Sequence, residues 1–236
     1  MSLRPRKLAN KFNISPSTLR NYEAKGLIPP AMRSANGYRM YTEQHEAYLA
    51  CIQAMAPSFG MEVTSEVLHC LQRNELDDAL WIVREREVML YQDKVNLDQL
   101  VGELRSYADG SQPYELIEHF NIHEVSKRTG VAKSAIRYWE RSGMFNTERN
   151  PDNDYRLYNK SHLLKIKMIQ VLNSSVYSED TVSLKQSIAE LDLNYIDKAV
   201  TLVENIKIHQ NKTIKSQLGG LSYLYELFLS LGGLEK

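Results

Sequence analysis

The sequence predicts a mainly α-helical protein with small β wings, formed by internal duplication. Each repeat is expected to hold a winged helix-turn-helix head and then a long coiled-coil-type helix. Three observations predict this: a segment recurs after 117 positions, each copy has two short helical patterns before a turn-rich hairpin, and each copy ends in a long apolar repeat. The predicted segments are head 1 (1–56), a helical support with long helix 1 (57–117), head 2 (118–173), and a helical support with long helix 2 and an apolar tail (174–236).

The duplication is visible without a gap when 117 is added to each residue number. Leu8–Ala56 then matches its counterpart at 11 of 49 positions, including Arg20 with Arg137 and Glu23 with Glu140. Average residue frequencies would give about three matches by chance. The whole chain is therefore interpreted as two diverged copies of one unit.

The start of each copy has the punctuation of two short helices. Pro5–Phe12 is a short amphipathic segment with its apolar side chains on one side. After a turn, Ser15 can cap a second helix, Pro16 suits its first position, and Gly26 can end it. Two short helices joined by a tight turn, with a polar and basic outer face on the second, indicate a helix-turn-helix. The second helix of such a motif enters the DNA major groove.

A hairpin follows the second helix. Asn36-Gly37 is a strong turn signal, because both residues tolerate positive φ, and the residues after it alternate as a strand does. Arg33 and Arg39 on this wing could clamp the phosphate backbone beside the groove. Thr42 can cap the helix that comes next.

Charge is distributed in a way that fits nucleic-acid binding. The chain is neutral overall, yet its four predicted segments carry net charges of +5, −7, +4 and −2 in order. A polyanion would therefore meet two basic heads on acidic supports.

These motifs resemble the signature of MerR-family regulators, and the resemblance covers both heads, roughly half of the chain. Phe59-Gly60-Met61 also resembles the turn after the third helix of that family. The first copy carries the signature as Ser17-Thr18-Leu19-Arg20-Asn21-Tyr22-Glu23-x-x-Gly26-Leu27-Ile28-x-Pro30, Arg33 and Asn36-Gly37-Tyr38-Arg39-x-Tyr41, and the second as Ser134-Ala135-Ile136-Arg137-Tyr138-Trp139-Glu140-x-x-Gly143-Met144 and Asn153-Asp154-Tyr155-Arg156-Leu157-Tyr158.

The resemblance implies that recognition-helix and wing arginines contact DNA, with wing tyrosines beside them. Three positions depart from the pattern: Asn21 stands where the family often has Tyr, Asp154 replaces the wing glycine, and Asn150 replaces Arg33 although Arg149 is adjacent. The two heads are therefore expected to grip DNA differently. The predicted DNA-binding residues are Ser17, Thr18, Arg20, Asn21, Arg33, Tyr38 and Arg39 in head 1, and Lys133, Ser134, Arg137, Tyr138, Arg149, Tyr155 and Arg156 in head 2.

Structural roles are predicted for several neighbours of these residues. Glu23 and Glu140 are expected to orient an arginine or pair within the head rather than to recognise cytosine. His45 and His162 are expected at helix starts or in packing, not on a metal. Core positions are predicted for Tyr22, Tyr41, Trp139 and Tyr158, which share a face with Leu19 or Ile136.

A coiled-coil seam is predicted in each support. The first helix, about 28 residues and about 42 Å long, would carry seven apolar residues at nine seam positions. In the family such a helix pairs antiparallel with its twin, and here the twin lies in the same chain. A link of about 10 residues spans at most about 35 Å, which favours an intramolecular pseudo-dimer. The predicted seams are Leu76, Leu80, Val83, Glu87, Leu90, Lys94, Leu97, Val101, Leu104 and Ile196, Val200, Val203, Lys207, Gln210, Ile214, Gln217, Leu221, Leu224, Phe228.

Other classes of function are disfavoured by the sequence. No nucleophile–base pair, phosphate loop, metal cluster or membrane-spanning run is visible, so no enzyme activity and no cofactor are predicted, and a cytoplasmic location is expected. Cys51 and Cys70 are interpreted as reduced buried thiols. The expected partners are double-stranded promoter DNA and, indirectly, RNA polymerase. Two alternatives stay open: an excisionase-like architectural or recombination-accessory DNA-binding protein, and a protein-interaction scaffold. Self-association through the apolar tail Tyr223–Leu229 competes with the pseudo-dimer.

Overall fold

The computed structural model describes residues 3–111, 118–193 and 195–232. Within them the chain is mainly helical, and the same series of elements occurs twice along it. The chain divides into two compact units, one of residues 1–88 and 212–236 and the other of residues 89–211. Each unit therefore contains one head and one portion of each long helix.

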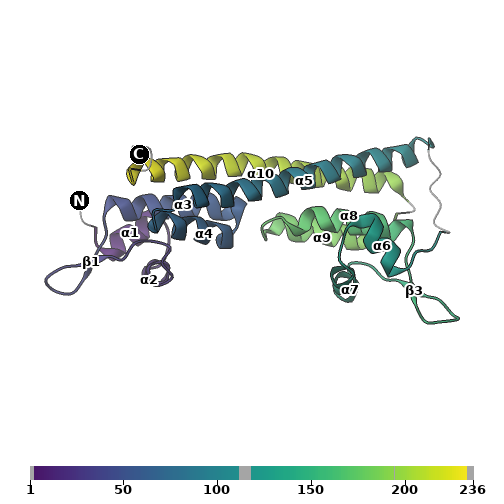
Figure 1. Cartoon of the computed structure of the whole chain (residues 1–236), viewed down its shortest axis with the longest axis horizontal. Coiled ribbons are helices and arrows are strands. Elements are labelled where there is room, and N and C mark those ends of the chain that lie inside the picture. The colour runs from purple at the N-terminus through teal and green to yellow at the C-terminus, as the bar shows by residue number, and fades with distance from the viewer. Residues whose placement is uncertain (1–2, 112–117, 194, 233–236) are drawn as a thin grey trace. The chain divides into compact units, whose positions relative to one another are not determined.

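The first head has two short helices, a two-stranded hairpin and two further helices (Figure 1). Its strands are antiparallel, and Met32 pairs with Met40 while Arg33 pairs with Arg39. The predicted helix-turn-helix and wing are both present. The elements are α1 (Pro5–Lys11), α2 (Pro16–Ala24), β1 (Met32–Arg33), β2 (Arg39–Met40), α3 (Glu43–Phe59) and α4 (Met61–Gln72).

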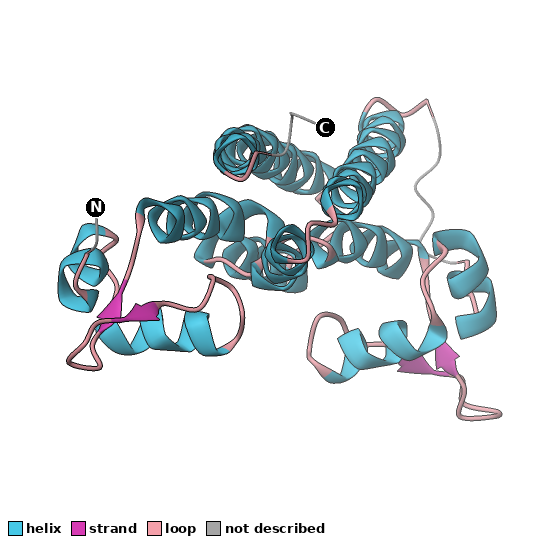
Figure 2. Cartoon of the chain, turned by 60° about the vertical axis from the view of Figure 1, so that its left-hand side comes forward, coloured by secondary structure: helices cyan, strands magenta, loops and turns pink. Residues whose placement is uncertain are grey.

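The second head repeats this series, and Figure 2 shows a short hairpin beside the helices of each head. Long helices follow both heads: α5 (Leu76–Ala108) follows the first and α10 (Ile196–Ser230) the second. The elements of the second head are α6 (Ile122–Thr129), α7 (Lys133–Arg141), β3 (Glu148–Arg149), β4 (Arg156–Leu157), α8 (Lys160–Asn173) and α9 (Glu179–Glu190).

A histidine secures the start of the helix after each wing. The backbone N–H of Thr42 donates to Nδ1 of His45 at 3.0 Å, and that of Asn159 donates to Nδ1 of His162 at 3.0 Å. An N–H of the helix start that would lack an intrahelical partner is thereby satisfied. Nε2 of His162 lies 2.7 Å from the carbonyl oxygen of Asn146, so this ring also ties the segment after α7 to α8. The predicted helix-start role of both histidines is confirmed.

The core of the first unit includes the end of the chain. Leu8, Leu19 and Tyr41 of the head are fully buried in one cluster with Leu224 and Leu227 of α10. The backbone of α10 approaches α3 closely at Gly220, where an added Cβ would lie 3.2 Å from the carbonyl oxygen of Ala54. The long helix of the second copy therefore closes the core of the first head.

The core of the second unit shows the reciprocal arrangement. Leu97, Leu100 and Leu104 of α5 are buried in one cluster with Val125 and Ile136 of the second head. The long helix of the first copy thus packs into the core of the second head.

Two ion pairs define the direction of α5 and α10 in the second unit. Arg105 lies 2.9 Å from Glu204, and Lys207 lies 3.3 Å from Asp98. Because the residue numbers along the two helices run in opposite senses, α5 and α10 are antiparallel in this unit.

The observed seam in α5 keeps most predicted positions, such as the buried Val83, Leu97 and Leu104, and departs from the prediction at Leu80 and Lys94. Leu80 is 48% exposed and Ala79 is buried in its place, because the start of α5 packs on the core of the first head. The exposed Lys94 pairs with Asp98, whereas Asp93 is buried and bonds to the hydroxyl of Ser174. In α10, Ile214 is also exposed, while most remaining seam positions are buried or half-buried.

The competing model, self-association through the tail, requires apolar side chains of the tail to be exposed. Leu224, Leu227 and Phe228 are buried in the first unit and cannot form the exposed stripe on which that model depended. The predicted break after α5 begins at Asp109, with Gly110 at φ +73°. Gln112 and Pro113, which the sequence also places in this break, lie outside the described residues.

Both cysteines are free thiols in buried positions, as predicted for Cys51 and Cys70. Burial raises the pKa of the Cys51 thiol to about 12. In the described part of the chain, every helix is too short or too polar to cross a bilayer.

Candidate nucleic-acid interface

The exposed side of α2 carries the polar residues predicted to face DNA. Ser15 caps the helix, because its Oγ accepts from the backbone N–H of Thr18 at 3.0 Å and lies 2.6 Å from the Ser17 hydroxyl. Leu19 is fully buried and fixes which side of α2 faces the core. Ser17, Arg20 and Asn21 are exposed as a result, and Thr18 is half-buried.

The corresponding helix of the second head, α7, presents a different surface. Ala132 precedes it and offers no side-chain cap. Ile136 and Trp139 are buried, which turns the opposite face outward. Tyr138 is 60% exposed although it is aromatic. The predicted residues Lys133, Ser134, Arg137 and Tyr138 are all exposed on this helix.

The two wings end in turns that place a residue at positive φ. Gly37 has φ +77° and Asp154 has φ +57°, and these residues are 117 positions apart. Each wing arginine folds over its own turn: Arg33 donates to the carbonyl oxygen of Gly37 at 3.1 Å, and Arg149 donates to that of Asp154 at 2.9 Å. The next residue in each turn, Tyr38 or Tyr155, is more than 70% exposed.

Strand register corrects one predicted correspondence. An ungapped repeat aligns Arg33 with Asn150, but Arg149 pairs with Arg156 as Arg33 pairs with Arg39. The connection from α7 to β3 in the second head is therefore one residue shorter than the connection from α2 to β1 in the first, and the wing turn is one residue longer. The two differences cancel, which hides them from a fixed offset. Arg149 is thus the structural counterpart of Arg33, and no wing arginine has been lost.

In each head an ion pair joins the second helix, α2 or α7, to the wing. Nε of Arg39 donates to Glu23 at 2.6 Å, and Nε of Arg156 donates to Glu140 at 2.6 Å. The glutamate side chains are only 13% and 15% exposed, and the arginines about a third exposed. The other oxygen of Glu23 accepts from the backbone N–H of Ala31. The predicted orienting role of both glutamates is confirmed.

These contacts use one N–H donor of Arg39 and of Arg156 and fix the position of both side chains. A guanidinium has five N–H donors, and Nε–H is used within the head. The side chain is therefore held in place before any ligand arrives, rather than extended into solvent. Tyr41 and Tyr158 are fully buried beside these pairs, as predicted. Burial and the Glu23 carboxylate raise the pKa of Tyr41 to about 12, so this phenol stays neutral.

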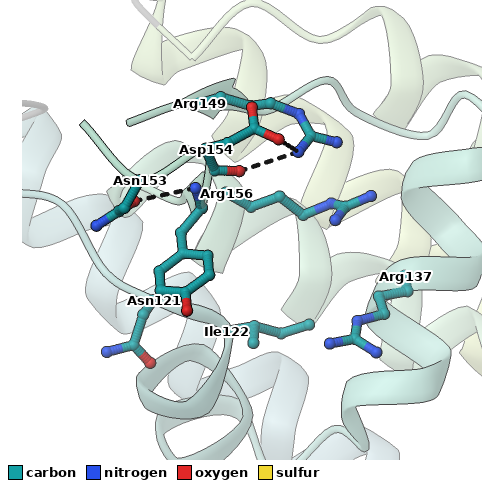
Figure 3. Close-up of a pocket in the computed structure, with 8 residues that line it drawn as sticks. Asn121, Ile122, Arg137, Arg149, Asn153, Asp154 and Arg156 are labelled. Atoms are coloured by element: carbon teal, nitrogen blue, oxygen red, sulfur yellow. Dashed lines mark hydrogen bonds and ion pairs between the residues drawn. The ribbon is translucent and has the colours of Figure 1, made fainter. Parts of the chain in front are cut away.

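A cavity of about 620 Å³ separates α7 from the wing of the second head (Figure 3). Arg137 lines it from the helix, and Arg149, Tyr155 and Arg156 line it from the wing. A smaller cavity of about 410 Å³ is lined by Arg137, Arg156, Ser134 and Arg141. Several guanidinium groups around one groove form a surface suited to phosphate oxygens.

Arg141 and Asn121 line these cavities but were not among the predicted residues. Arg141 stands four positions after Arg137 on the same helix face, a spacing that could have revealed it. Comparison of the repeats could not, because the matching residue in the first copy is Ala24. Asn121 caps α6 by accepting from the backbone N–H groups of His123 and Glu124. Its place in the cavity depends on the tertiary fold and so could not be predicted from the sequence.

Comparison with known families matches both heads. The family described as "MerR family regulatory protein" matches residues 4–41, and that described as "MerR HTH family regulatory protein" matches residues 120–183. The matched segments contain α1, α2 and the wing of the first head, and the same elements with α8 of the second.

Similar curated proteins include two regulators and one enzyme. The HTH-type transcriptional regulator CueR of Escherichia coli O157:H7 is 40% identical over 74 residues, covering 30% of this chain and 55% of that protein. The mercuric resistance operon regulatory protein of Bacillus cereus is 36% identical over 76 residues, covering 32% and 58%. The Type II methyltransferase M.Eco47II of Escherichia coli is 35% identical over 66 residues, covering 28% and 16%.

The chain thus spans between half and three-fifths of these two regulators and about one sixth of the methyltransferase. No solved structure matches it significantly. The two family matches fall on the winged heads, and their paired occurrence agrees with the duplicated elements of the fold. The chain therefore carries two winged helix-turn-helix heads in tandem, each matched by a MerR family model.

Proposed function

We propose that this protein is a sequence-specific, double-stranded-DNA-binding transcription regulator. The observation that carries the proposal is the repeated surface in which an exposed recognition-helix arginine, Arg20 or Arg137, stands beside a wing held by a helix–wing ion pair. Base edges are recognised in the major groove by such helices, and wings contact the phosphate backbone. The two similar regulators, one of them named for an operon, support promoter DNA as the ligand.

We further propose that a single chain acts as a pseudo-dimer on a bipartite promoter site. The core of each head contains residues of the long helix of the other copy, such as Leu224 in the first unit and Leu104 in the second. In a dimer of single-headed chains, these contacts would come from a second chain. Their presence within one chain supports an intramolecular pair and removes the concentration dependence of dimerisation. RNA polymerase would then respond indirectly, through the bound promoter.

Selection of duplexes with the purified chain tests this function. The expected product is one enriched site with two unlike half-sites, because α2 presents Thr18 and Asn21 where α7 presents Ala135 and Tyr138. Binding should weaken steeply with salt, as phosphate contacts require. A strictly two-fold symmetric site would contradict the pseudo-dimer with unlike heads.

Footprinting and a duplex-binding assay at low salt separate the alternatives. A footprint over a promoter spacer supports the regulator, whereas one over a recombination site would favour an excisionase-like architectural protein. A chain that binds no duplex at low salt, with its helical content intact by circular dichroism, would overturn DNA binding and leave a scaffold.

A further inference from the structure

The wing turn of the second head contains a carboxylate that the first head lacks. Asp154 stands at the turn position of Gly37, and both residues have positive φ. Oδ2 of Asp154 lies 2.8 Å from a terminal nitrogen of Arg149, the structural counterpart of Arg33. Figure 3 shows this pair among the residues that line the cavity, together with Arg137 and Arg156.

Both heads hold the wing arginine by a contact to the backbone of the turn. Arg33 donates to the carbonyl oxygen of Gly37, and Arg149 makes the equivalent contact to the carbonyl oxygen of Asp154. The backbone contact is therefore common to both heads, and the carboxylate is an addition in the second. Since glycine has no side chain, its position supplies no counter-charge to Arg33.

We propose that Asp154 is an internal counter-ion: it pairs with Arg149, competes with a DNA phosphate for that arginine, and so weakens the binding of the second wing to DNA. The proposal rests on the DNA-binding function proposed above and assigns a regulatory residue within that surface. A phosphate that reaches Arg149 must displace the carboxylate, and the displaced charge then repels the backbone. The first head would consequently provide the stronger wing contact.

Exposure of the pair makes the exchange feasible. The side chains of Arg149 and Asp154 are 50% and 81% exposed, so the ion pair is accessible to solvent and weak. A DNA phosphate carries the same full charge as a carboxylate and can accept two parallel N–H bonds from a guanidinium, so it competes well with an exposed carboxylate that bonds one terminal nitrogen of Arg149. The carboxylate therefore modulates binding without preventing it.

Asp154→Asn is the sharpest test, because asparagine tolerates positive φ and keeps the turn while the charge is lost. The variant is expected to bind a selected duplex roughly 3–10-fold more tightly at moderate salt, and the slope of log affinity against log salt should steepen by about one. Asp152→Asn is the matched control. Asp152 lies in the same turn and is exposed, and its backbone N–H bonds to Asn150. Equal gains in both variants would mean that net charge alone matters, and would overturn the counter-ion.

The reciprocal variant tests the difference between heads. Gly37→Asp is expected to weaken binding by a similar factor, with the first wing then resembling the second. Arg149→Ala should cost more affinity in the Asp154→Asn background than in the wild type, since only there is Arg149 fully available. A wild-type chain that binds no duplex overturns both this inference and the proposed function. Wild-type binding that Asp154→Asn leaves unchanged overturns this inference alone.

Discussion

Glu23 of α2 and Arg39 of β2 lie 2.6 Å apart, and Glu140 and Arg156 repeat this contact at the same distance in the second head. Each glutamate lies on a recognition helix and each arginine on a wing. The pair therefore fixes the angle between the two elements that are proposed to contact DNA. Pre-positioning of this kind lowers the entropy lost on binding.

The helix–wing pair is expected to contribute measurably to stability because the glutamates are nearly buried. A double-mutant cycle with Glu23→Gln and Arg39→Gln should give a coupling free energy of about 1–2 kcal/mol in urea unfolding, since loss of one partner leaves the other poorly solvated. The exposed pair Arg84–Glu87 on α5 is the control and should give about 0.3 kcal/mol. Equal couplings for the two pairs would show that the helix–wing contact has no special role.

Recognition-helix arginines are expected to contribute to sequence discrimination. Arg20→Ala and Arg137→Ala should each weaken binding to the selected duplex by about 1–3 kcal/mol, because a contact to a base edge has that value. Fluorescence anisotropy with selected and scrambled duplexes measures the effect. Arg84→Ala removes an exposed arginine from α5 and should leave affinity unchanged. If the double variant Arg20→Ala/Arg137→Ala folds and binds as the wild type does, α2 and α7 do not read DNA.

Stability should fall as the solution becomes mildly acidic. Burial lowers the pKa of His45 and His162 below their ordinary value of 6.5. Between the lowered pKa and 6.5 the unfolded chain binds more protons than the folded chain, so stability rises with pH in that window and is lost as pH falls below about 6.5. The structural reason is that Nδ1 of each ring accepts a backbone N–H and must be unprotonated to do so.

Urea unfolding between about pH 5.5 and pH 8 measures this dependence. His162→Gln should reduce the slope of stability against pH in the window, because one of the two rings is gone. His119→Gln, at an exposed position, is the control and should keep the wild-type slope. A slope that His162→Gln leaves unaltered would exclude the capping ring as its source.

The end of α10 should behave as part of the first head. Leu227 is fully buried with Leu8 and Leu19, so Leu227→Ala should destabilise the chain by about 2–5 kcal/mol. Leu229 lies two residues further on the same helix and is 45% exposed, so Leu229→Ala should cost well under about 1 kcal/mol. Similar melting temperatures for the two variants would contradict the packing of α10 on this core.

Local signals in the sequence were sufficient to predict the heads. The cap at Ser15, the turn at Asn36-Gly37 and the orienting role of Glu23 all depend on residues close in sequence or on repetition at a fixed spacing. Tertiary packing decided what the sequence could not. A strict heptad places Leu80 rather than Ala79 on the seam. The start of α5 instead packs on the core of the first head, which buries Ala79 and leaves Leu80 exposed.

The wings illustrate a second limit. A fixed offset cannot detect a one-residue deletion followed by a one-residue insertion, so it aligns Arg33 with Asn150, whereas the strand register identifies Arg149 as the counterpart. The ion pair of Arg149 with Asp154 was equally hidden, because it depends on the folded turn.

The stoichiometry of the complex tests the pseudo-dimer most directly. Sedimentation velocity of a fluorescent full-length site, with protein at concentrations near the dissociation constant, measures how many chains occupy one site. The account predicts one chain per complete bipartite site, with both half-sites protected in a footprint of that complex. Two chains per site, together with no binding by the single chain, would contradict it.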